Sequence, residues 1–209
     1  MAAQVTSCLL LLTVAVPAKA FFFAQSYSWE TNLPNNQLVS ECAKYYQLFG
    51  VARIASTDTN LSNEDFISSQ TQYDIRRNKM AIRFHAPVPQ STTTTPVCFV
   101  MDSSVVAEEV TGELINRGDA GEVETGEPMT RFVEAADKLT IQSSMLNHGW
   151  FTTAFCAKAI NRGNAYLMKS SSILQTSQSF KVNGLIDPSQ PELNVPYNIN
   201  VTSGITFIP

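Results

Sequence analysis

The N-terminal segment constrains this chain most, because it decides the compartment and therefore the state of the cysteines. An apolar run over residues 8–16 ends at Pro17, and Ala18-Lys19-Ala20 follows as a small-x-small sequence typical of a signal-peptidase site. We expect residues 1–20 to be a secretory signal peptide and the mature chain to begin at Phe21. The sequence therefore predicts a secreted, periplasmic or otherwise extracytoplasmic protein.

The alternative interpretation keeps the apolar segment as a membrane anchor over residues 5–24, since about 20 apolar residues are enough to span a bilayer. Lys19 would then lie within the apolar part, where a charged side chain is costly. A membrane is an expected partner only if this segment is retained. Residues 21–36 are polar and rich in turn formers, and they predict an extended N-terminal arm before a single domain over residues 37–209.

Four cysteines stand at positions 8, 42, 98 and 156. Removal of the signal leaves three, so one disulfide can form among Cys42, Cys98 and Cys156, and the spacing does not say which two pair. The chain has no CxxC motif, neither of its two histidines lies near a cysteine with metal-ligand spacing, and no glycine-rich phosphate loop is present. We therefore expect neither a metal site nor a cofactor.

Composition narrows the class of partner. The chain has 209 residues, of which 44% are apolar and 15% charged, so it can bury a sizeable core. A formal net charge of −4 gives no general attraction to a phosphate backbone. Nucleic acid is therefore not expected, whereas protein partners or self-assembly are.

The apolar pattern predicts an α+β fold with a helix-rich central part, a small mixed sheet and a β-rich C-terminal segment. Helices are expected over residues 38–49, 66–75, 106–115 and 129–145, with a further helix that ends near residue 160. Strands are expected over residues 80–85, with His85 on the polar face, over residues 97–101, and in short stretches after residue 165. Residues 197–209 are expected to pair as strands with a sheet of the same chain.

Two similar hexapeptides, "INRGDA" from Ile115 and "INRGNA" from Ile160, raise an alternative function. The first contains Arg117-Gly118-Asp119, the tripeptide that some adhesive proteins present to integrins. Both copies also fit helix ends, with Gly118 and Gly163 at positive φ. The second copy has Asn164 where an adhesive ligand needs aspartate, which favours the helix-end interpretation and leaves the adhesive ligand as a weaker alternative.

Cys42 and His85 are the candidate catalytic residues. Papain-like peptidases place a nucleophilic cysteine at a helix N-terminus and a histidine on a later strand, so that the imidazole takes the thiol proton. A cysteine at the start of the expected helix and a histidine on the expected strand resemble that arrangement, although no flanking family motif is present. We favour an exported, noncatalytic structural or interaction protein, such as a subunit of an extracytoplasmic assembly, and keep an exported cysteine hydrolase as the alternative.

Overall fold

The computed structural model describes residues 24–33, 38–56, 66–88, 90–103, 107–187 and 190–209. The expected signal peptide over residues 1–20, the expected terminus at Phe21 and nearly all of the alternative anchor over residues 5–24 lie outside these ranges. In the part that is described, no helix is both long and apolar enough to cross a membrane.

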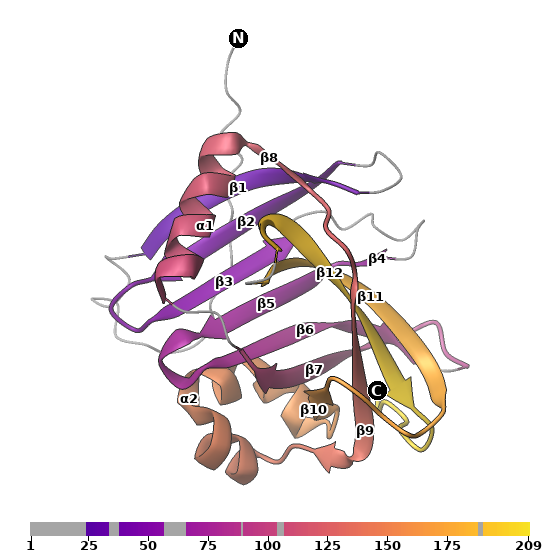
Figure 1. Ribbon diagram of the computed structural model, residues 1–209. Coiled ribbons are helices and arrows are strands. Elements are labelled where there is room, and N and C mark those ends of the chain that lie inside the picture. The colour runs from indigo at the N-terminus through magenta and orange to yellow at the C-terminus, as the bar shows by residue number, and fades with distance from the viewer. Residues whose placement is uncertain (1–23, 34–37, 57–65, 89, 104–106, 188–189) are drawn as a thin grey trace.

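The described chain forms one twelve-stranded sheet with two α-helices (Figure 1). In chain order the strands are β1 (Ala24–Asn32), β2 (Leu38–Tyr46), β3 (Val51–Ser56), β4 (Phe66–Ile67), β5 (Ser69–Asp74), β6 (Lys79–Pro87), β7 (Thr94–Asp102), β8 (Glu122–Glu124), β9 (Met129–Lys138), β10 (Ala165–Lys169), β11 (Thr176–Asp187) and β12 (Gln190–Thr202). The helices are α1 (Ala107–Ala120) and α2 (Ile141–Asn161), and a short 3-10 helix, η3 (Ile75–Arg77), follows β5. Across the sheet the order is β4-β11-β12-β9-β10-β7-β6-β5-β3-β2-β1-β8.

The sheet curls so that its two halves face each other. Strands β1, β2, β3, β5, β6 and β7 form an antiparallel meander, and β9, β11 and β12 cross in front of it (Figure 1). Tyr73 on β5 joins the halves, because its hydroxyl donates to the Ile186 carbonyl at 3.2 Å and accepts from the Ile186 N–H at 2.8 Å. The Ser69 hydroxyl donates to the Asn183 carbonyl at 3.2 Å in the same region.

The main core fills the concave side of this curl. Phe84, Phe99 and Phe180 meet there with ring centroids 5.1 to 5.6 Å from Phe84. Helix α1 adds Val110 and Leu114 to the same core. Helix α2 instead covers the convex side of β6, β7 and β10, where its buried residues form a second, smaller core.

The expected fold class is wrong, because the molecule is predominantly β and not helix-rich with a small sheet. Residues 38–46, 66–67, 69–74 and 129–138 were expected in helices and form β2, β4, β5 and β9. Strand β2 is buried on both faces, at Val39 and Cys42 among others. A strand covered on both sides loses the alternation that marks a half-buried strand. Residues 24–32, expected in the N-terminal arm, form β1.

Several local predictions are confirmed. Strands occur at residues 79–87 and 94–102, helix α1 follows the second of them, and β10, β11 and β12 supply the expected C-terminal strands. The helix expected over residues 129–145 begins instead at Ile141, where Thr140 forms a capping box with Ser143, while the break expected before the next helix occurs at Gly149, with φ 81°. Strand β12 pairs with β11 of the same chain, as expected, but residues 203–209 form no strand.

The two hexapeptides do not end their helices in the same way. Gly163 has φ 70° directly after α2, as predicted. The prediction for Gly118 is wrong, because α1 continues to Ala120 and the left-handed residue is Gly121, with φ 74°. Gly121 N–H donates to the Arg117 carbonyl at 3.0 Å, which closes the last turn.

Candidate functional site

Arg117 of the adhesive tripeptide is buried, with 1% of its surface exposed. Its Nε donates to Glu113 Oε1 at 3.1 Å, one turn earlier on α1, and its Nη2 donates to the Leu193 carbonyl at 2.7 Å. The guanidinium also lies 5.6 Å from the ring centroid of Trp29. Asp119 is exposed, but an adhesive ligand needs the arginine at the surface as well. The structure therefore does not assemble Arg117, Gly118 and Asp119 into an exposed recognition site.

Arg117 belongs to a buried polar network that the sequence did not predict. Glu41 Oε2 accepts hydrogen bonds from Trp29 Nε1 at 2.9 Å, from Thr31 Oγ1 at 2.6 Å and from Asn194 Nδ2. Burial raises the pKa of Glu41, while the hydrogen bonds and the charge of Arg117 oppose that shift. The network joins β1, β2, β12 and α1, so its role is to position these elements.

Cys42 and His85 are not brought together. Cys42 is on β2, is 2% exposed and is not a free thiol. His85 is exposed on the polar face of β6, as predicted, and β3 and β5 lie between the two strands. Neighbouring strands are about 4.8 Å apart, so the backbones at these positions are on the order of 14 Å apart. A thiolate–imidazole pair is not available between them.

A disulfide among the predicted cysteines is confirmed. Cys98 on β7 is bonded to Cys156 on α2, across a sequence separation of 58 residues. Both residues lie in the smaller core beneath α2. The bond therefore attaches the helix covalently to the convex side of the sheet.

Helix α2 and the turn after β2 expose a group of large apolar side chains, here called the α2 apolar surface. Leu146 is 74% exposed, Leu48 59% and Trp150 45%. Aromatic rings connect the two segments, because Phe151 lies 5.3 Å from Phe49 and 5.3 Å from Trp150 between ring centroids. The full set is Leu48, Phe49, Ile141, Met145, Leu146, Trp150 and Phe151.

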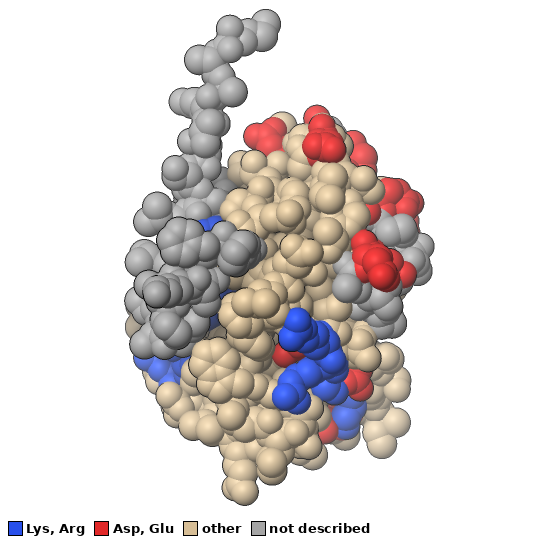
Figure 2. Space-filling view, turned by 90° about the vertical axis from the view of Figure 1, so that its left-hand side faces the viewer, with Lys and Arg blue, Asp and Glu red and all other residues tan. Residues whose placement is uncertain are grey.

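Two exposed arginines border this surface, because Arg76 Nη2 donates to the Leu48 carbonyl at 2.7 Å and Arg77 lies against Gly149 of α2. In Figure 2 the acidic side chains gather mainly at the top and right of the molecule, and the lower part is largely uncharged around a cluster of basic side chains with a few acidic ones beside it. Monomeric proteins rarely keep several large apolar side chains exposed together unless another surface covers them. The α2 apolar surface is therefore a candidate interaction surface.

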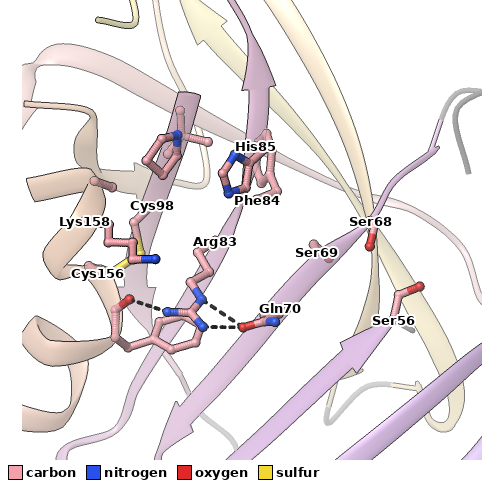
Figure 3. Close-up of a pocket in the computed structure, with 14 residues that line it drawn as sticks. Ser56, Ser68, Ser69, Gln70, Arg83, Phe84, His85, Cys98, Cys156 and Lys158 are labelled. Carbon is pink, nitrogen blue, oxygen red and sulfur yellow. Dashed lines mark hydrogen bonds between the residues drawn. A yellow bond between two sulfur atoms is a disulfide. The ribbon is translucent and has the colours of Figure 1, made fainter. Parts of the chain in front are cut away.

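A polar cleft of about 250 Å³ lies beside α2, where β3, β5, β6 and β7 come together (Figure 3). Its lining includes Gln70, Arg83, His85, Lys158 and the Cys98–Cys156 disulfide, together with several serines. Figure 3 shows Arg83 and His85 projecting from β6 while Lys158 reaches toward them from α2.

The Arg83 guanidinium is held in a fixed position in this cleft. Its Nε and Nη2 donate to Gln70 Oε1 on β5, and its Nη1 donates to the Phe155 carbonyl at 3.0 Å. The guanidinium lies 4.4 Å from the centroid of the Phe155 ring, and Arg53 lies 5.5 Å from the same ring. Burial, with the nearby charge of Arg53, lowers the pKa of Arg83 to about 10.

Comparison with known proteins returned no relative. No protein-family model, no curated protein and no solved structure matches the chain. Of the cleft residues, the sequence identified His85 as a catalytic candidate and Cys98 and Cys156 as possible disulfide partners. It did not identify Arg83, although Arg83 stands two positions before His85 on the same polar face of a correctly predicted strand. Gln70 and Lys158 were missed because β5 was expected as a helix and α2 had no predicted contact with β6.

Proposed function

We propose that the protein is an exported, noncatalytic interaction protein that docks in an extracytoplasmic assembly through the α2 apolar surface. One observation carries the proposal, which is the exposure of Leu146 and Trp150 on α2 and of Leu48 in the turn that ring contacts connect to this helix. Burying such side chains is worth about 25 cal/mol per Å² of apolar area, so a complementary surface gains affinity from them. Aromatic residues and methionine are enriched in protein interfaces, as they are here.

Two observations support export. Cys98 and Cys156 form a disulfide, and disulfides persist mainly in oxidising compartments. The N-terminal sequence has the features of a signal peptide. Terminal sequencing of the protein recovered from the medium or periplasm tests this part, with Phe21 as the expected first residue. Recovery from the cytoplasm with Met1 and two reduced thiols at Cys98 and Cys156 would contradict it.

The docking proposal is tested by one substitution and a matched control. Leu146→Lys places a charge on the α2 apolar surface, whereas Ile173→Lys introduces the same charge at another exposed apolar residue, in the β10–β11 connection. Sedimentation analysis of the purified protein over a range of concentrations detects self-association. A photoreactive amino acid at position 146 or 173, introduced in the producing cells, detects a different partner.

We expect Leu146→Lys to abolish the assembly found by either method and Ile173→Lys to leave it intact. Trp150 adds a spectroscopic readout, because its emission shifts to shorter wavelength when the exposed indole becomes covered, whereas Trp29 is buried in the free protein. A monomer that forms no cross-links from position 146, and whose Trp150 stays accessible to a water-soluble quencher in the producing cells, would refute docking through this surface.

A further inference from the structure

The cleft beside α2 gathers positive charge that no described carboxylate offsets. The charges that act on His85 come from Lys158, Arg162 and Arg83, and all three are cationic. Arg53 adds a fourth cation next to Arg83. Among the described residues, the ion pairs involve other side chains and include none of these four. The protein as a whole is acidic, so this local excess of positive charge is not a consequence of composition.

Arg83 combines a fixed position with unused donors. A guanidinium has five N–H donors, and three hydrogen bonds are made to Gln70 and the Phe155 carbonyl, so two donors remain (5 − 3 = 2). Both partners are uncharged, so they orient the guanidinium without neutralising it. The face that contacts Phe155 is covered, and the cleft is the open space next to the group.

A second cation lines the same cleft. Lys158 on α2 is exposed at its mouth, and its ammonium has three donors.

We propose that this cleft binds a small oxyanion, as the phosphate or carboxylate group of a ligand, with Arg83 and Lys158 as the charged donors. Arginine held in one orientation suits the two oxygens of such a group, and lysine adds a point charge. The cleft and the α2 apolar surface use different residues, so this proposal does not depend on the docking proposal. Burial disfavours the charged form of Arg83 and lowers its pKa, and a bound anion would stabilise that charged form.

The two histidines provide the test and its internal control. His85 lines the cleft, whereas His148 is buried in α2 near Lys79 and Asp102. Imidazole resonances are followed by NMR while inorganic phosphate replaces chloride at constant ionic strength and at a series of pH values. We expect phosphate to raise the pKa of His85 and to leave the pKa of His148 unchanged. Acetate in place of phosphate distinguishes a planar carboxylate from a tetrahedral oxyanion as the preferred group.

Variants assign the effect to the cleft. Lys158→Gln removes an exposed charge that lines the cleft, and Lys138→Gln removes an exposed charge on β9 that does not. We expect Lys158→Gln to weaken phosphate binding about five- to tenfold and Lys138→Gln to change it less than about twofold. The proposal is overturned if neither anion shifts His85, if both histidines shift together, or if the two lysine variants behave alike.

Discussion

Replacement of Phe207 by alanine should destabilise the protein strongly, although this residue lies in the irregular segment after β12. Phe207 is 1% exposed. Its ring centroid lies 6.3 Å from Phe99, 6.5 Å from Tyr166 and 6.0 Å from Phe180, so it fills the space between β7, β10 and β11. Truncation of a buried phenylalanine costs about 3–5 kcal/mol, which combines lost transfer free energy with the cavity that remains.

The surroundings of Phe207 place the expected cost toward the upper part of that range. Asn164 clamps the next residue, because its Nδ2 donates to the Ile208 carbonyl at 2.7 Å and its Oδ1 accepts from the Ile208 N–H at 2.9 Å. The backbone is therefore fixed and cannot move inward to fill the cavity. We expect Phe207→Ala to lower the free energy of unfolding by about 4 kcal/mol.

Urea unfolding followed by far-UV circular dichroism measures this difference, with an unchanged m-value as the check that both proteins unfold in the same way. Ile208→Ala is the matched control in the same segment, since its side chain is 51% exposed and its backbone bonds to Asn164 persist. That control should cost less than about 1 kcal/mol. A cost below about 1 kcal/mol for Phe207→Ala would refute the packing of the tail against its own chain and make the tail available to a partner.

Two further predictions concern the helix ends and the buried carboxylate. Gly163→Ala should lower the free energy of unfolding in urea by about 1 kcal/mol or more, because φ is 70° and the new Cβ would lie 2.7 Å from Lys138 Nζ. Gly118→Ala, inside α1, is the control and should be close to neutral. Equal costs at both sites would contradict the prediction. Burial raises the pKa of Glu41 in the folded protein above its value in the unfolded chain. As the pH rises, the carboxyl therefore ionises first in the unfolded chain, and the folded state becomes less stable between the two pKa values. The unfolding free energy of the native protein minus that of Glu41→Gln should therefore fall as the pH is raised from about 4 toward neutrality, and a flat or rising difference would show that Glu41 is not the buried group.

Sequence reasoning succeeded where a local signal decides the structure and failed where burial depends on distant segments. Strand β6 alternates buried and more exposed side chains over residues 82–87, the chain breaks at Gly149 between the two expected helices, and both are local features. Strand β5 has polar Gln72 and Asp74 buried between two layers, so its composition resembles a polar helix start more than a strand. No pattern within β5 indicates that other parts of the chain cover both of its faces.

The same distinction applies to the candidate sites. His85 was placed correctly on the polar face of β6, because alternation along one strand determines the face. The position of Arg83 is fixed by hydrogen bonds to Gln70 on the neighbouring strand and to Phe155 on α2, which is 72 residues away in the sequence. Arg117 was expected at a helix end or, less favoured, in an adhesive ligand, and neither interpretation included its burial against Trp29, which lies 88 residues earlier in the sequence.

The strand order has a consequence for how the chain folds. The meander from β1 to β7 pairs strands that follow each other closely, so it can form as soon as those residues are available. Strand β1 also pairs with β8, with Glu30 opposite Glu122, and β4 pairs with β11, with Phe66 opposite Lys181. Both pairings join segments that are far apart in the sequence. Pairings between segments so far apart in the sequence form slowly, and the apolar face of the meander stays exposed until β11 and β12 pack against it. Newly made chains should therefore pass through an intermediate with an open sheet face, and conditions that delay its C-terminal half should favour aggregation over native folding.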